Sequence, residues 1–301
     1  MIKTVIFFNS FHNGDVHLSR TFAEEVGKFL LNNLGVASYY AHNNELSLLK
    51  DMDYVKSVPM NFEIEKNIPS KKQNETVYLN TWYGVERFAW IKRYGITYNC
   101  LYHLFEAHLN RYFKLSLKNI SSDLEYFFPA IKFERFFIDE IANWVDKYRD
   151  RKKVFISNCE GYSGQPKMHE QFNMAAEILA ARYPSFLFIL TNEAPATGNN
   201  IIYSKEIIKK AGNDLNENAF LSTKCDIIVG NCSGPHTFAY NKTNFFESTK
   251  SIIVFSHTGI EGTWFRKEDF PLNYKCRMEC YNGAGVDDVV EIIDANIQRI
   301  L

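Results

Sequence analysis

Hydrophobic and polar residues alternate along this chain in blocks that predict strands followed by helices. Residues 2–10 form an apolar run rich in β-branched and aromatic side chains, and residues 17–33 place apolar side chains at helical spacing. Similar apolar runs at 36–42 and 76–82 predict two further strands. The beginning of the chain is therefore predicted to be an alternating α/β unit.

Residues 98–144 have a mainly helical pattern and are rich in aromatic side chains. Aromatic stripes at helical spacing are typical of a hydrophobic core, so we expect most of these rings to be buried. The basic run at 148–153 separates this region from a new apolar run at 154–157. We therefore place a domain boundary near residue 150.

The second half of the chain repeats the alternation of strands and helices. Five apolar runs predict strands, at 154–157, 186–191, 201–204, 226–230 and 251–256. Three intervening segments predict helices, at 167–183, 214–224 and 236–241. This alternation predicts a parallel, doubly wound sheet. A closing amphipathic helix is predicted at 286–301, with one apolar face formed by Val286, Val289, Val290, Ile293 and Ile297.

Composition and charge narrow the function classes. The 301 residues include 34 Lys and Arg against 35 Asp and Glu, and both signs are spread evenly over the two halves, so we expect no nucleic-acid partner. No apolar stretch approaches the length of a membrane span, and the start lacks a signal-peptide core, which predicts a cytoplasmic protein. The six cysteines are scattered and form no CxxC pair, so we expect reduced thiols rather than disulfides or zinc ligands.

Three loops lie where a predicted strand leads into a predicted helix, at 12–17, 158–167 and 230–236. In parallel α/β sheets this is the position at which ligands bind, because helix N-termini offer free backbone N–H groups there. In the third loop Gly230 and Gly234 allow close approach of a ligand, and Ser233 adds a hydroxyl, so a diphosphate would fit. An ordinary strand-to-helix turn is the alternative.

Other residues of these loops are candidates for the same nucleotide site. In the second loop, Lys167 lies at the predicted start of a helix and could neutralise phosphate, with a solvated lysine as the alternative. We include Asn231 of the third loop as a further binding candidate. Candidates for contacts with a nucleoside or diphosphate also lie at or just after strand ends, where ordinary loop residues are the alternative: Glu160, Gln165, Asn192 and Glu193.

The first loop holds a carboxylate at the end of a predicted buried strand. Asp15 follows Gly14, and a carboxylate held there can act as a general base, although an ordinary helix N-cap is the alternative. His12 and His17 flank Asp15 and are candidates to orient a substrate or tune the carboxylate. Structural or solvated histidines are the alternative for both.

Two segments together resemble a known family. They are VIFFNSFHNGDVHLSR at 5–20 and CDIIVGNCSGPHTFAYNKT at 225–243. They resemble the GT-B glycosyltransferases of the ADP-heptose:lipopolysaccharide heptosyltransferase family. The resemblance rests on short motifs in both predicted domains. It implies two Rossmann-like domains facing a cleft, with residues 1–150 binding the acceptor, residues 151–285 binding the nucleotide sugar, and a closing helix at 286–301.

The resemblance also implies an activity. Asp15 matches the catalytic aspartate of the family and Gly14 its loop glycine, Lys167 matches the lysine after the first strand of the nucleotide domain, and Ser233 with Gly234 matches the diphosphate-binding turn. The implied reaction is an inverting, metal-independent transfer of a sugar to a hydroxyl of a bacterial surface glycan. No cofactor is expected. The implied partners are a nucleotide sugar and a glycan or glycolipid acceptor. Peripheral contact with a membrane surface is a separate expectation.

Cys232, which stands where the family usually has an aspartate, supports two alternatives. With Gly230 and Gly234 it fits G-x-C-x-G, a nucleophile elbow, which would make the protein a cysteine hydrolase or amidotransferase. That reading needs Glu247 and a downstream histidine as partners. The second alternative is a two-lobed binding protein that keeps the fold and has lost the catalytic activity.

Asp51 and Asp53 form a DxD pair, a pattern that holds a divalent metal on sugar diphosphates in another glycosyltransferase fold. Here the pair follows a polar, helix-like stretch rather than a clear buried strand. We therefore expect a solvated turn and no metal site.

Overall fold

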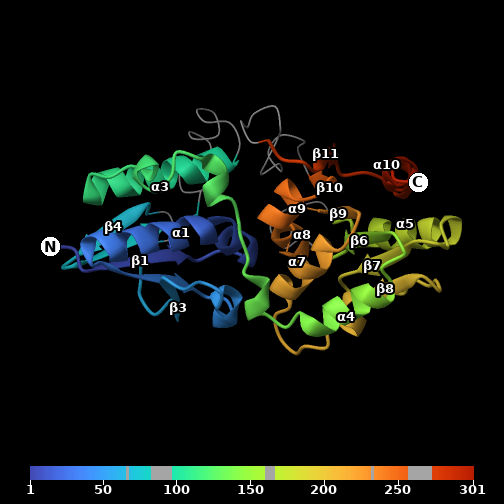
Figure 1. Ribbon diagram of the computed structural model, residues 1–301, viewed down its shortest axis with the longest axis horizontal. Coiled ribbons are helices and arrows are strands. Elements are labelled where there is room, and N and C mark those ends of the chain that lie inside the picture. The colour runs from blue at the N-terminus through green and yellow to red at the C-terminus, as the bar shows by residue number, and fades with distance from the viewer. Residues whose placement is uncertain (66–67, 83–96, 160–166, 232–233, 257–272) are drawn as a thin grey trace. The chain divides into compact units, whose positions relative to one another are not determined.

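The computed structural model describes residues 1–65, 68–82, 97–159, 167–231, 234–256 and 273–301. Its elements are shown in Figure 1. The described residues divide into two compact units, one up to Ile131 and one from Lys132 onward. We call them the first and the second unit. Each is built around its own sheet.

The division falls earlier than the boundary placed near residue 150. The helix α4 (Asp139–Lys147) follows it and contacts α6 (Ser204–Ile207), so α4 belongs to the second unit. The closing helix α10 (Val286–Gln298) also belongs to the second unit, where it packs against α5 (His169–Arg182). The apolar pattern alone did not reveal which neighbour α4 would contact.

The first unit contains five strands in the order β3-β2-β1-β5-β4. These are β1 (Thr4–Asn9), β2 (Ala37–His42), β3 (Val55–Pro59), β4 (Ser70–Gln73) and β5 (Thr76–Asn80). All pairings are parallel except that of β4, which forms an antiparallel hairpin with β5. The three strands predicted from sequence are confirmed. The edge strands β3 and β4 were missed because neither forms an apolar run: β4 is polar throughout, and the two valines of β3 are separated by Lys56 and Ser57.

Aromatic rings form the core between the helices of the first unit. The helices include α1 (Asn13–Leu34), α3 (Thr97–Phe113) and the short 3₁₀ helices η1 (Leu46–Leu49), η3 (Leu117–Asn119) and η4 (Leu124–Phe127). The ring of Phe22 in α1 stacks on Phe105 at 4.9 Å and on Phe127 at 5.1 Å between centroids. All three rings are buried. The expectation that the aromatic stripe forms core is therefore confirmed for these residues.

The second unit contains a six-stranded parallel sheet in the order β11-β10-β9-β6-β7-β8. Its strands are β6 (Lys153–Ser157), β7 (Leu187–Leu190), β8 (Ile201–Tyr203), β9 (Ile227–Asn231), β10 (Ser251–Ser256) and β11 (Arg277–Asn282). Counted along the chain, this is the 3-2-1-4-5-6 order of the doubly wound dinucleotide-binding fold. The predicted parallel sheet is confirmed. Its strand order reverses between β6 and β9, which is the topological switch point.

Helices cover this sheet and bury its apolar side chains. Besides α4 and α10 they are α5, α6, α7 (Leu215–Thr223), α8 (Gly234–Phe238) and α9 (Lys242–Phe246), with the 3₁₀ helix η5 (Phe133–Arg135). The predicted closing helix is confirmed, because one face of α10 is buried in the core formed with α5. The buried residues of that face include Val289, Val290, Ile293 and Ile297.

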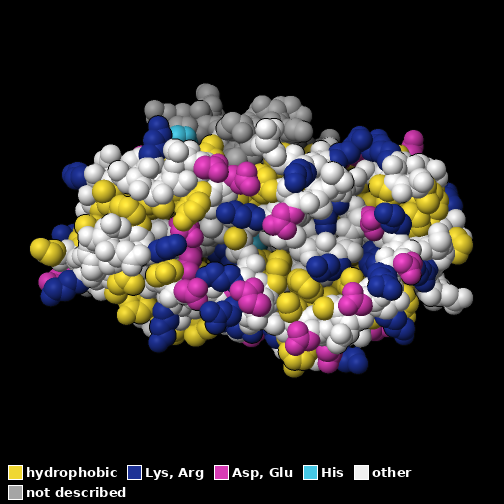
Figure 2. Space-filling view, in the orientation of Figure 1, with side chains coloured by type: hydrophobic (Ala, Val, Ile, Leu, Met, Phe, Trp, Pro, Cys, Tyr) yellow, Lys and Arg dark blue, Asp and Glu magenta, His cyan; other side chains and the backbone are white. Residues whose placement is uncertain are grey.

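The surface agrees with the balanced charge of the sequence. On the face shown in Figure 2, basic and acidic side chains are interspersed rather than gathered by sign. Within the described ranges, no helix is long and apolar enough to cross a membrane. The five cysteines in those ranges are all free thiols, and Cys232 lies outside them.

Three buried histidines make stability depend on pH. Burial lowers the pKa of His42 and of His108 to about 4 and that of His236 to about 3. In the unfolded chain these rings titrate near the ordinary value of about 6.5. Below that pH the histidines are protonated in the unfolded state and still neutral in the native state. The unfolding free energy therefore decreases as the pH falls towards 4.

We therefore expect unfolding free energy to decrease by up to about 1 kcal/mol per histidine for each pH unit between ~6.5 and ~4. Melting temperatures measured at pH 7, 6 and 5 check this. Substituting the buried His108 by Gln should flatten the dependence, whereas the same change at the exposed His12 should not. Equal melting temperatures at pH 7 and pH 5 in the unsubstituted protein would contradict the expectation.

Candidate functional site

The switch point of the second unit brings two loops together. Strands β6 and β9 are parallel neighbours, with Ser157 beside Gly230 at their carboxyl ends. A Cβ atom built on Gly234, the first residue of α8, would lie 3.8 Å from the sulfur of Cys159. Cys159, just after β6, therefore lies close to the start of α8 at this edge, where doubly wound sheets bind their ligands.

Asn158, directly after β6, is held by four hydrogen bonds. Its buried amide nitrogen donates to Oδ1 of Asn173 at 2.8 Å and to the carbonyl of Asn192 at 3.0 Å. Its amide oxygen accepts from the backbone N–H of Asn192 at 2.7 Å and from the hydroxyl of Thr191 at 3.3 Å. One side chain thus joins the ends of β6 and β7 to α5. This is a rigid frame of the kind that a preorganised site requires.

His169 opens α5 at the same edge. Its Nδ1 bonds to the carbonyl of Asn158, and a carbonyl can only accept, so Nδ1 carries the proton. In the neutral ring Nε2 is then an acceptor, and the ring is half-buried. The sequence analysis missed both Asn158 and His169. The signal that could have found them is a polar residue directly after a buried strand, followed by a histidine at the start of the next helix.

Gly230 is required by the packing of His236. The imidazole of His236 lies against β9, and a Cβ on Gly230 would be 2.8 Å from both its Cδ2 and the Cβ of Ser157. The His236 side chain is fully buried, and its Nδ1 bonds to the hydroxyl of Tyr240 at 3.2 Å. Gly230 therefore serves the packing of His236 against β9, a role that the sequence analysis did not predict.

Substituting Gly230 by Ala is expected to lower the unfolding free energy by about 1–3 kcal/mol, because the added methyl group overpacks the contact with His236. Urea unfolding checks the value. Gly234→Ala is the matched control, since a Cβ there meets atoms only at 3.8 and 3.9 Å and should cost little. Equal losses in the two variants would contradict this account of Gly230.

The other residues predicted for this unit have different environments. Lys167 is exposed two residues before α5, and Glu193 is exposed after β7. Asn192 is held by its backbone to Asn158, and Asn231 is buried at the end of β9. Three predicted binding residues lie outside the described residues: Glu160, Gln165 and Ser233.

Asp15 lies in the first unit, in the first turn of α1. The segment 12–17 was expected to be a loop, but the helix already begins at Asn13, so Gly14 is helical too. The backbone N–H of His12, which is exposed, donates to Oδ2 of Asp15 at 3.3 Å. Asp15 is therefore not the N-cap residue considered as its alternative: His12 takes that position, and the Asp15 carboxylate caps the helix start from the third helical residue. This turn lies at the carboxyl end of the central strand β1.

A buried polar chain lies directly below this turn. The hydroxyl of Ser19 bonds to the carbonyl of Asp15 at 3.0 Å and to the hydroxyl of Tyr40 at 2.6 Å. Tyr40 bonds in turn to Thr81 at 2.6 Å, which accepts from the amide of Asn9 at 3.2 Å. Burial raises the pKa of Tyr40 strongly, and the charge of Asp15 raises it further. The first turn of α1 is thereby tied to β1, β2 and β5.

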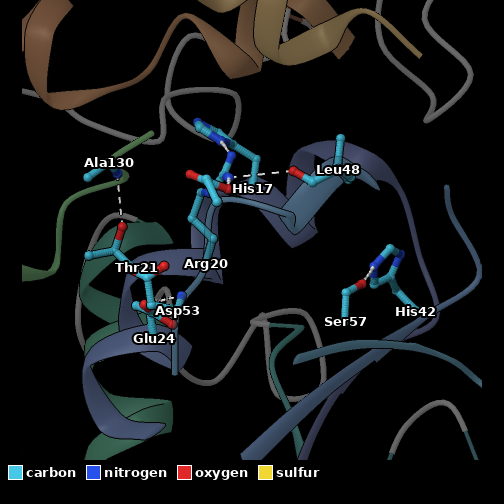
Figure 3. A network of polar contacts seen from close by, with 10 residues as sticks. His17, Arg20, Thr21, Glu24, His42, Leu48, Asp53, Ser57 and Ala130 are labelled. Atoms are coloured by element: carbon cyan, nitrogen blue, oxygen red, sulfur yellow. Dashed lines mark hydrogen bonds and ion pairs between the residues drawn. The ribbon is translucent and has the colours of Figure 1, made fainter. Parts of the chain in front are cut away.

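His17 does not share the environment of Asp15. It is fully buried, and its Nδ1 accepts from the guanidinium of Arg20 at 3.4 Å (Figure 3). Arg20 also forms a buried ion pair with Asp51. A histidine in such a structural network has no access to a substrate, which argues against the catalytic role expected for it.

The DxD pair is not a solvated turn, and this corrects the sequence analysis. Asp51 is only 3% exposed and pairs with Arg20. The segment after it is anchored because the carboxylate of Glu24 accepts the backbone N–H of Asp53 at 2.8 Å (Figure 3). Among the residues that the structure describes, no group of three His, Cys, Asp or Glu could hold a metal ion.

Two further features of the first unit involve other residues. His42 bonds through Nε2 to Ser57 at 2.7 Å, but the N–H of Asn44 donates to its Nδ1, so Nε2 carries the proton and cannot activate the serine as a base (Figure 3). A pocket of about 540 Å³ lies at the amino-terminal ends of β2 and β3, lined in part by Leu31 and Tyr54. Neither feature contains a predicted site residue.

Comparisons with known proteins find the same fold along the whole chain. The Escherichia coli ADP-heptose LPS heptosyltransferase II has 12% sequence identity and a TM-score of 0.51, and the match covers 99% of each chain. The E. coli heptosyltransferase WaaC with ADP has 8% identity and a TM-score of 0.52, covering 97% of this chain and 99% of that one. No family model and no curated protein matches the sequence. The chain therefore has the fold of these GT-B heptosyltransferases. At such low sequence identity, the comparison shows the fold and not the activity.

Proposed function

We propose that this protein is a glycosyltransferase that moves a sugar from a nucleotide-activated donor to a hydroxyl acceptor of a bacterial surface glycan. The second unit binds the nucleotide and the first unit binds the acceptor. The observation that carries the proposal is the switch point of the 3-2-1-4-5-6 sheet in the second unit, where β6 and β9 end side by side and lead to α5 and α8. Likeness of fold to heptosyltransferases over nearly the whole chain supports it.

A site for the diphosphate of the nucleotide sugar needs free backbone N–H groups and positive charge. The N-terminus of α5, a helix of 14 residues, supplies both the N–H groups and the positive end of the helix dipole. Lys167 stands exposed just before it and adds a cation. Asn158 is fixed beside this helix start by four hydrogen bonds to Asn173, Thr191 and Asn192, so the end of β6 needs little reorganisation when a ligand binds.

The transfer step uses Asp15 as the general base. Asp15 takes the proton of the acceptor hydroxyl while that oxygen forms a bond to the anomeric carbon of the donor sugar. The bond between the anomeric carbon and the diphosphate oxygen breaks, and the nucleoside diphosphate leaves with the electron pair. One displacement of this kind inverts the anomeric configuration and requires no metal ion. The charge on the leaving diphosphate is stabilised by the α5 amides and by Lys167.

The cysteine-hydrolase alternative receives no support from the residues around the switch point. His236 is fully buried, its Nδ1 is engaged by Tyr240, and burial lowers its pKa to about 3. It is therefore not placed to take a proton from a substrate or thiol at the surface. Cys232 and His257 lie outside the described residues.

A thermal-shift screen against nucleoside diphosphates and nucleotide sugars, run with EDTA, tests the proposal. A ligand that binds only the folded state raises the melting temperature. We expect one nucleotide to raise the melting temperature in EDTA. Lys167→Ala should weaken binding of its diphosphate form roughly tenfold and leave binding of the bare nucleoside unchanged. Lys205→Ala, at another exposed lysine, is the control. No shift with any nucleotide would contradict the proposal and favour the binding-protein alternative.

A further inference from the structure

Two neighbouring strands of the first unit end in the same way. Strands β1 and β5 are parallel neighbours, and each ends in a buried asparagine, Asn9 and Asn80. The side-chain oxygen of Asn9 accepts the backbone N–H of Phe11 at 3.0 Å. That of Asn80 accepts the backbone N–H of Trp82 at 2.9 Å. Both are turns in which an asparagine side chain bonds the backbone two residues on.

These twin turns bring two aromatic rings face to face. The ring of Phe11 stacks on that of Trp82, with centroids 3.7 Å apart and planes 25° from parallel. A hydrogen bond of 3.2 Å from the amide of Asn9 to the hydroxyl of Thr81 joins one turn to the other. Because Asn9, Asn80 and Thr81 are almost fully buried, the aromatic pair is held by the sheet itself.

The exposure of this pair differs from that of the core rings. Phe7, Phe8 and Phe22 of the same unit are fully buried, whereas Phe11 and Trp82 are only half-buried. The pair lies at the carboxyl edge of the sheet, between β1 and β5, where the strand order reverses. Doubly wound sheets bind ligands at such an edge, so this half-buried pair lies where a ligand is expected.

The pair is also adjacent in the chain to the proposed base. His12 follows Phe11 directly, and its backbone N–H is the group that donates to the carboxylate of Asp15. The turn that orients the Phe11 ring therefore leads straight into the helix start that holds Asp15. A sugar ring resting on this surface would have its hydroxyl groups near that helix start.

We propose that Phe11 and Trp82 form a stacking platform for a neutral pyranose ring of the acceptor. This inference rests on the proposed function and names the substrate class of its acceptor site. The C–H groups on one face of a pyranose ring are weakly positive, and the face of an aromatic ring is negative, so the two attract each other. The same negative face repels a phosphate, which selects a neutral sugar. A rigid aromatic pair also loses little conformational entropy on binding.

Titration with neutral saccharides tests the platform directly. The probes are the methyl pyranosides of glucose, galactose, mannose and N-acetylglucosamine and their disaccharides, with binding followed by calorimetry and by ligand-observed NMR. We expect at least one to bind, Trp82→Ala to weaken it roughly tenfold, and Trp82→Phe to retain most of the affinity. Trp144→Ala is the matched control, because Trp144 is also half-buried and pairs with Tyr148 at 5.0 Å in the second unit.

Phe11→Leu keeps an apolar side chain without an aromatic face and should weaken saccharide binding in the same way. It serves as the second test if the Trp82→Ala protein does not fold. Unchanged affinity in a folded Trp82→Ala or Phe11→Leu protein would overturn the platform, as would the absence of binding by every saccharide. The nucleotide thermal shift is measured separately on the same proteins. Its absence in the unsubstituted protein would overturn the proposed function, whereas its presence without saccharide binding would overturn only the platform.

Discussion

Replacing Asp15 by Asn is expected to lower kcat for sugar transfer by about 10²–10⁴-fold, the usual contribution of a general base. The amide oxygen of asparagine can still accept the N–H of His12, so the helix start should be preserved. Only the basic carboxylate is lost. The proposed function places the donor on the second unit, so donor binding should not change.

Release of nucleoside diphosphate from the donor identified by thermal shift measures the rate, and the thermal shift of the same nucleotide measures binding. Asp123→Asn, at an exposed aspartate that caps the start of η4, is the matched control with an expected change in kcat of less than about threefold. A folded Asp15→Asn protein with an unchanged kcat would show that Asp15 is a helix cap and nothing more.

Replacing Asp51 by Ala is expected to reduce the unfolding free energy by about 3–5 kcal/mol. The change leaves the guanidinium of Arg20 buried without its carboxylate partner, since both side chains are at most 3% exposed. Such a loss is a large part of the stability of an ordinary domain. The double change Arg20→Met with Asp51→Leu removes both charges and should restore much of it.

Urea unfolding checks this expectation, and Asp53→Ala is the matched control. Asp53 is exposed, so its substitution should change the unfolding free energy by less than about 1 kcal/mol. A DxD metal site predicts a different pattern, in which either change abolishes a metal-dependent activity and leaves stability intact. That pattern would contradict the structural role assigned to Asp51.

Much of the fold could be predicted from the pattern of apolar residues. Buried strands such as β1 and β9 are recognised by their apolar runs, and α10 is recognised by its apolar face. These apolar patterns arise because the side chains that they place in the core are buried on folding. The edge strand β3 is different, since it carries Lys56 and ends in Pro59. Edge strands bury less surface, and their sequences need not be apolar. The position of α4 depends on tertiary contacts that periodicity does not encode.

The candidate site was predictable only in part. A carboxylate after the first strand and glycines after a later one are visible in the sequence, and the structure places both at sheet switch points. Buried asparagines look like loop residues in a sequence, so Asn9 and Asn158 were missed. The recurrence of asparagine two residues before an aromatic residue, at Asn9 and Asn80, is a signal that could have found the twin turns.

The most direct test of the central claim is a proton NMR time course of the protein with its nucleotide sugar donor and a saccharide acceptor in EDTA. The proposed function predicts that the anomeric signal of the donor disappears and that a new glycosidic signal of the opposite configuration appears. Persistence of the donor, or a product of retained configuration, would contradict an inverting, metal-independent transfer with Asp15 as its base.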